Sequence, residues 1–129
     1  MPHTVPHSVM FHHFHDDKHI PIQGSLNETN FREMLIWLKE NYSLLGAKNY
    51  KDKFESGTLA NEDICLSFDD ALQCQYDIAI PVMEDFKIDA FFFVYSSAFT
   101  NSPDYLEVYR YFRNSAFDDV NHFYFKFFD

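Results

Sequence analysis

The sequence contains little cysteine, with two residues of this type among 129. Cys65 and Cys74 show neither a Cys-x-x-Cys spacing nor a Cys–His spacing, so the common zinc-binding motifs are excluded. We expect two thiols that are buried or half-buried in a reducing compartment.

Basic residues are also scarce. Ten Lys and Arg stand against 20 Asp and Glu, which gives a formal net charge of -10. A chain this acidic repels phosphate backbones and anionic lipid surfaces. We therefore expect neither a nucleic acid nor a membrane as a partner.

Long apolar runs are absent, and no segment approaches the roughly 20 residues that a membrane-spanning helix needs. Residues 1–7 lack both the basic region and the apolar region of a secretory signal. With Met1 as the natural start, we expect a cytoplasmic protein.

Apolar and aromatic side chains, in contrast, are abundant, at 47% and 19% of the residues. This composition predicts a packed globular domain. Three apolar segments are predicted strands, at residues 8–11, 64–68 and 88–95. The third is an uninterrupted apolar run, which predicts burial on both faces.

Helices are predicted between and after these strands. Ser25 and Glu28 have the spacing of a capping box, and the apolar residues 31, 34, 35 and 38 then follow a helical period. Further helices are predicted near residues 50–54, from Pro81 to about 86, from Ser102 and Pro103 onward, and at 123–128. The alternation of strands and helices predicts an α/β fold with a parallel sheet.

Polar residues follow each predicted strand, namely residues 12–15, Asp69 with Asp70, and residues 95–97. The carboxyl ends of parallel strands meet at one edge of a sheet, so these groups are expected on one face. Of two adjacent carboxylates, one can bind a cation while the other acts as a base. The alternative is that these acids only cap the segment that follows.

The segment Ile64–Ala71, ICLSFDDA, resembles the first signature of the polysaccharide deacetylase (NodB-homology) family, in which an apolar strand runs into T/S-F-D-D-G. Other segments resemble the family in the same order: residues 9–12 its opening strand, 24–35 its first helix, 76–84 the helix after the signature, and 88–94 the next strand. The resemblance covers residues 9–97.

This resemblance implies hydrolysis of an N-acetyl or O-acetyl group on a carbohydrate, assisted by a divalent metal that is usually zinc. By position, Asp69 would be the catalytic base and Asp70 a metal ligand, and His12 is the candidate for substrate binding. The implied fold is a partial (β/α) barrel of about three parallel strands with intervening helices. Ala71 stands where the family has a glycine. Because alanine tolerates this turn only with a negative φ, we expect a negative φ at Ala71.

The chain departs from the family in its metal ligands. The family's H-S/T-x-x-H pair follows the third strand, but beyond Val94 this chain has only His122. His15 and His19 lie at the correct edge, although a replacement site there is not favoured. Three strands cannot close a barrel, so residues 1–129 are expected to form one incomplete domain that is inactive alone.

Two alternatives remain open. The chain could be a non-catalytic carbohydrate-binding or regulatory remnant, with Phe14 and Tyr95 as candidates for stacking on sugars, or a hydrolase of another carbon–nitrogen amide bond. The third predicted strand leaves an unpaired apolar edge. We expect this edge to meet either a missing C-terminal half or a second copy of the chain.

Overall fold

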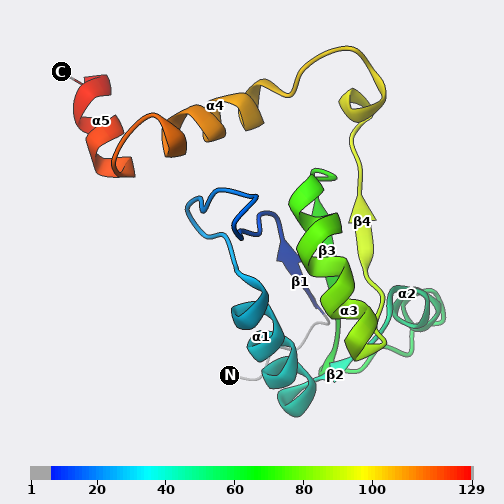
Figure 1. Cartoon of the computed structure of the whole chain (residues 1–129). Coiled ribbons are helices and arrows are strands. Elements are labelled where there is room, and N and C mark those ends of the chain that lie inside the picture. The colour runs from blue at the N-terminus through cyan, green and yellow to red at the C-terminus, as the bar shows by residue number, and fades with distance from the viewer. Residues whose placement is uncertain (1–6, 129) are drawn as a thin grey trace.

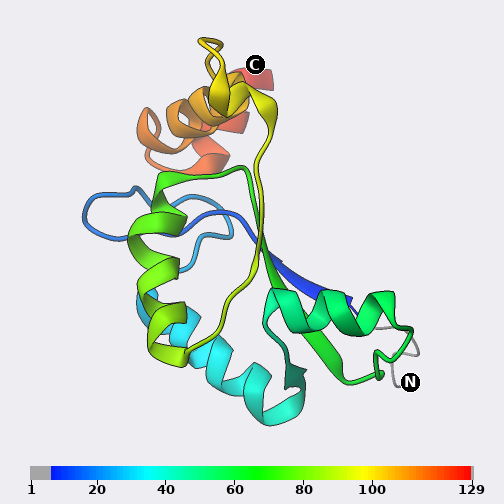
Figure 2. The ribbon, with the colours of Figure 1, turned by 90° about the vertical axis from the view of Figure 1, so that its right-hand side faces the viewer.

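The computed structural model of the chain describes residues 7–128, which form a parallel four-stranded sheet with helices on both faces (Figures 1 and 2). In chain order the elements are β1 (His7–Phe11), α1 (Glu28–Asn41), β2 (Ser43–Leu44), α2 (Ala47–Glu55), β3 (Asp63–Asp69), the π-helical turn η1 (Gln75–Ala79), α3 (Ile80–Phe86), β4 (Phe91–Phe93), the 3-10 turn η2 (Ser96–Phe99), α4 (Tyr105–Ser115) and α5 (Val120–Phe128).

Strand β3 is the centre of the sheet. β1 pairs with it along one edge, from His7 opposite Ile64 to Phe11 opposite Phe68. On the other edge, β2 pairs with the start of β3 and β4 with its end, where Asp69 lies opposite Phe93. Every pair is parallel, which confirms the predicted α/β class, although the two-residue β2 was not predicted.

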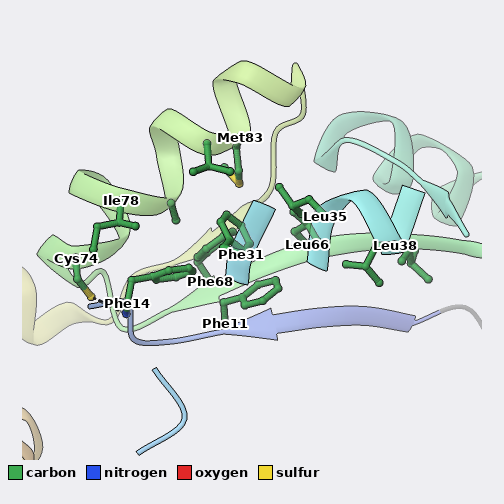
Figure 3. Packing of buried hydrophobic residues seen from close by; sticks show 13 residues of the cluster. Phe11, Phe14, Phe31, Leu35, Leu38, Leu66, Phe68, Cys74, Ile78 and Met83 are labelled. Carbon is green, nitrogen blue, oxygen red and sulfur yellow. Dashed lines mark hydrogen bonds between the residues drawn. The ribbon is translucent and has the colours of Figure 1, made fainter. Parts of the chain in front are cut away.

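The hydrophobic core lies between the sheet and the helices α1 and α3, which share one face (Figures 2 and 3). Helix α1 packs here because of its predicted helical period, which places Phe31 and Leu35 on one side, where both are completely buried. Phe31 packs edge-on against Phe11 and Phe68, with ring centroids 5.1 and 6.2 Å away. These contacts hold the ends of β1 and β3 together.

The opposite face of the sheet is only partly covered. Helix α2 lies on it, with the Tyr50 ring 6.3 Å from the Phe91 ring, but Met10 and Phe93 are 56% and 57% exposed. The prediction that the third strand is buried on both faces is therefore wrong. That strand is also shorter than predicted, because only Phe91–Phe93 pair with β3.

Two predicted helix starts are also wrong. Asn27, not Ser25, caps α1, and its side chain accepts a hydrogen bond of 2.8 Å from the N–H of Asn30. Asp104 caps α4 by accepting from the N–H of Leu106, so the helix begins two residues after Pro103. In both cases an Asn or Asp nearer the helix takes the capping role. The predicted helices near 50–54, 81–86 and 123–128 are confirmed.

Residues 1–6, on which the prediction about a secretory signal depends, lie outside the described residues. Within residues 7–128, no helix combines the length and the apolar character needed to cross a bilayer.

Candidate functional site

The acidic pair lies where β3 ends, on an unusual backbone. Asp69 is the last residue of the strand, and the two following residues are left-handed, with φ of 75° at Asp70 and 51° at Ala71. The expectation of a negative φ at Ala71 is therefore wrong. A non-glycine residue in this conformation costs about 1–2 kcal/mol. Strain of this kind concentrates at functional sites, where the surrounding structure holds it in place.

A buried glutamine stabilises this turn. The side-chain Nε2 of Gln75 donates to the carbonyl oxygens of Asp69, at 2.6 Å, and His12, at 2.8 Å. Gln75 therefore ties the carboxyl end of β3 to that of β1. Gln75 was not among the predicted site residues, although the sequence carries a signal for it: Gln75 shares one helical face with Ile78, Ala79 and Val82, all of which are buried.

The three predicted site residues lie together. His12 Nε2 is 3.8 Å from Asp69 Oδ2 and 4.0 Å from Asp70 Oδ2. All three side chains are about one-third exposed, at 36%, 30% and 26% in that order. These separations exceed hydrogen-bond length, so the carboxylates keep free lone pairs that face solvent.

Helix α4 adds a cation that was not predicted. Arg110 Nη1 lies 3.6 Å from Asp70 Oδ2 and is also hydrogen-bonded to Glu107. Glu107 in turn accepts a hydrogen bond of 2.8 Å from His13 Nε2. Burial favours the neutral form of Glu107, but the hydrogen bonds from His13 and Arg110 outweigh it and lower the pKa of Glu107.

An open cleft of about 560 Å³ adjoins the acidic pair. It is lined by Ser8, Met10, Ser67, Asp69, Asp70, Phe93, Val94 and Tyr95. His12 lines a neighbouring hollow of about 370 Å³ together with Arg110 and Arg113. Polar residues that follow β1, β3 and β4 thus gather at one edge of the sheet, as predicted.

The predicted aromatic candidates for sugar stacking differ in position. Phe14 is 2% exposed and packs in the core, so it is not available to a sugar. Tyr95 lines the cleft, and its hydroxyl donates to Asp104.

Cys65 and Cys74 are both buried free thiols, as predicted, and burial raises the pKa of Cys65 to about 11.

The residues around Asp70 do not fit a metal ion. Within the described part of the chain, no three His, Cys, Asp or Glu side chains form a group that could hold one, and a catalytic zinc needs about three protein ligands. His15 is hydrogen-bonded to Ser25 and His19 to Asp77, each at 2.8 Å, so they form no replacement pair. His122 lies in α5, where it pairs with Asp118.

Comparison with known proteins supports the fold. No family model and no curated protein matches the sequence. A solved structure of a de-N-acetylase from Aggregatibacter actinomycetemcomitans matches with a TM-score of 0.60 and 20% sequence identity, over 76% of this chain. The chain spans 40% of the length of that structure. The predicted resemblance in fold is therefore confirmed: 76% of this chain forms an α/β unit similar to part of a de-N-acetylase.

Proposed function

We propose that this chain binds an acetylated carbohydrate at the carboxyl ends of β1, β3 and β4 and does not hydrolyse it alone. The observation that supports this most is the acidic pair, which is about one-third exposed on a strained turn beside an open cleft. It lies at the edge where parallel α/β sheets bind ligands. The fold match to a de-N-acetylase suggests the class of ligand.

The cleft offers the groups that carbohydrate recognition uses. Asp69 and Asp70 can accept hydrogen bonds from sugar hydroxyls or from an acetamido N–H. Phe93 and Tyr95 present aromatic surface beside them, which suits the apolar face of a sugar ring. We assign His12 to the same ligand, as a donor or acceptor at the edge of the cleft.

Calorimetric titration with an oligosaccharide of N-acetylglucosamine tests this proposal. We expect binding that Asp69→Asn weakens about 10-fold or more, because a hydrogen bond to a charged group contributes about 1.5–3 kcal/mol. Asp52→Asn, an exposed acid on α2, is the control and should not change the affinity. No binding, or equal binding by Asp69→Asn, would contradict the proposal.

The titration also needs a control for charge. The de-N-acetylated oligosaccharide carries free amines, which a chain of net charge -10 attracts. Raised ionic strength screens this attraction. We expect the N-acetylated ligand to retain its affinity as salt increases, while that of the de-N-acetylated one falls.

A second candidate is hydrolysis, with Asp69 as the base and a divalent metal, such as zinc, at Asp70. The position of the pair at the end of β3 in a deacetylase-like fold favours it. Further ligands would have to come from outside the described residues, because these residues do not fit a metal. Acetate release is the measurement. Release by the purified chain with added zinc would replace our proposal by this one.

We also propose that a polypeptide carrying the remaining strands of the fold covers the open face of the sheet. The chain spans 40% of its structural match, and Met10 and Phe93 on this face are exposed. Analytical sedimentation distinguishes this partner from a second copy of the chain, because it measures whether the chain alone forms a dimer. We expect a monomer at all concentrations. A dimer that Phe93→Glu abolishes would show self-association instead.

A further inference from the structure

Asp70 has a resident counter-ion within the chain. Arg110 Nη1 lies 3.6 Å from its Oδ2 atom, and both side chains are 26% exposed. The next cationic candidate, His12, is 4.0 Å from the same oxygen. The carboxylate that the family resemblance assigns to a metal therefore already faces a guanidinium cation.

Arg110 is held in this position by a second acid. Glu107 lies one turn earlier on α4 and is hydrogen-bonded to Arg110 through Oε1, while its Oε2 accepts from His13. His13 lies two residues after the end of β1, so these contacts fasten α4 to the loop at the carboxyl edge of the sheet. Figure 1 shows α4 lying beyond this edge, close to the loop that follows β1. Glu107 is therefore a positioning residue for Arg110.

We propose that Arg110 is the cation of this acidic site, that it excludes divalent metal from Asp70, and that ligand binding there is metal-independent. A divalent ion at Asp70 would lie within a few ångströms of the guanidinium, and like charges at such a distance repel strongly. Because no three side chains of the described residues form a metal site, a divalent ion at Asp70 would be bound only weakly, and one positive charge is enough to exclude it. The inference rests on the proposed carbohydrate site and specifies its cofactor requirement.

Paramagnetic line broadening by Mn²⁺ in NMR spectra of the labelled chain tests the exclusion. We expect no selective broadening of the amides of residues 69–71 in the unmodified chain. Arg110→Gln should produce this broadening at a Mn²⁺ concentration at least about 10-fold below the highest one at which the unmodified chain shows none, and Asp70→Asn added to that variant should remove it. Arg32→Gln is the control, because Arg32 lies on α1 and pairs with Glu28 and Asp85 instead of the acidic pair.

Two results would overturn the inference. One is selective broadening in the unmodified chain that Asp70→Asn abolishes. The other is absence of broadening in both the unmodified chain and Arg110→Gln, because Arg110 would then not be what excludes the ion. Chemical shifts of the core amides report whether each variant is folded.

Carbohydrate titration with a chelator separates this inference from the proposed function. We expect equal affinity with and without EDTA. Binding that requires added metal would contradict metal independence and leave the carbohydrate site standing. Absence of binding under both conditions would contradict the proposed function, and the Mn²⁺ result would still decide the role of Arg110.

Discussion

The two ends of strand β3 both carry aspartate, in opposite environments. At the start, Asp63 is 2% exposed, accepts a hydrogen bond of 2.6 Å from Lys53 and another of 2.8 Å from the N–H of Ala60. At the end, Asp69 and Asp70 are about one-third exposed, and their nearest cationic nitrogens lie 3.6–4.0 Å away. The first end is fully hydrogen-bonded, while the second keeps acceptors available to a ligand.

The backbone shows the same contrast. β3 begins in ordinary strand pairing with β2, and two consecutive left-handed residues, Asp70 and Ala71, follow its last residue. A strained backbone lowers the stability of the fold, and it persists only where the surrounding structure holds it in place. The acids at the start of β3 therefore serve the fold, and we propose that those at its end serve binding.

The largest expected effect on stability is at Asp63, at the start of β3. Asp63→Asn removes the charge that Lys53 contacts and should lower the free energy of unfolding by about 2–3 kcal/mol, because a largely buried ion pair loses one partner. Urea denaturation measures it. Asp52→Asn, which breaks an exposed pair with Lys48, should change stability by less than about 0.5 kcal/mol. Equal losses of stability in Asp63→Asn and Asp52→Asn would show that Asp63 is no more important to the fold than an exposed acid.

The same aspartate predicts a pH dependence. Burial favours the neutral form of Asp63, but hydrogen bonds from Lys53 and the N–H of Ala60 outweigh it and lower its pKa. A carboxyl with a lowered folded pKa stabilises the protein above its unfolded pKa of about 3.9. This contribution is lost as pH falls through the folded value. Unfolding curves from pH 7 to 3 should therefore show a smaller loss for Asp63→Asn than for the unmodified chain.

At the strained end, a substitution should stabilise the fold. Ala71→Gly relieves the positive φ and should raise the free energy of unfolding by about 0.5–1 kcal/mol. Ala116→Gly is the control, because Ala116 has a φ of -93° and glycine brings no relief there. Thermal and urea unfolding measure both. A loss of stability in Ala71→Gly would show that the turn is not strained.

The smallest effect is expected from the acidic pair itself. Replacing Asp69 and Asp70 together by Asn should change stability by less than about 1 kcal/mol, since their ion pairs are long and partly exposed to solvent. Urea denaturation again provides the value. A loss comparable to that of Asp63→Asn would mean that the pair is structural, as the capping alternative holds.

Local patterns explain which parts of this fold the sequence predicted. The period of Phe31, Leu35 and Leu38 specifies the buried face of α1 directly. The apolar run of β3 followed by two acids specifies where the site lies, because parallel strands bring their carboxyl ends to one edge. The meeting of His12 with Asp69 and Asp70 follows from that rule.

Other features depend on tertiary contacts that no local pattern contains. Arg110 reaches Asp70 only because α4 crosses the edge of the sheet, and 40 residues separate the two in sequence with no periodicity that links them. Capping at Asn27 and Asp104 depended on which of several neighbouring polar residues reached the free N–H groups. The exposure of Phe93 depends on what covers the sheet, which its own apolar run does not encode.

Chemical-shift mapping tests the central claim, that the open end of β3 binds an acetylated carbohydrate. An NMR titration of the labelled chain with an N-acetylglucosamine oligosaccharide should shift the amides of Asp69, Asp70, Ala71, His12 and Tyr95, and leave those near Asp63 unchanged. Shifts confined to other surfaces, or none at millimolar ligand, would contradict the account.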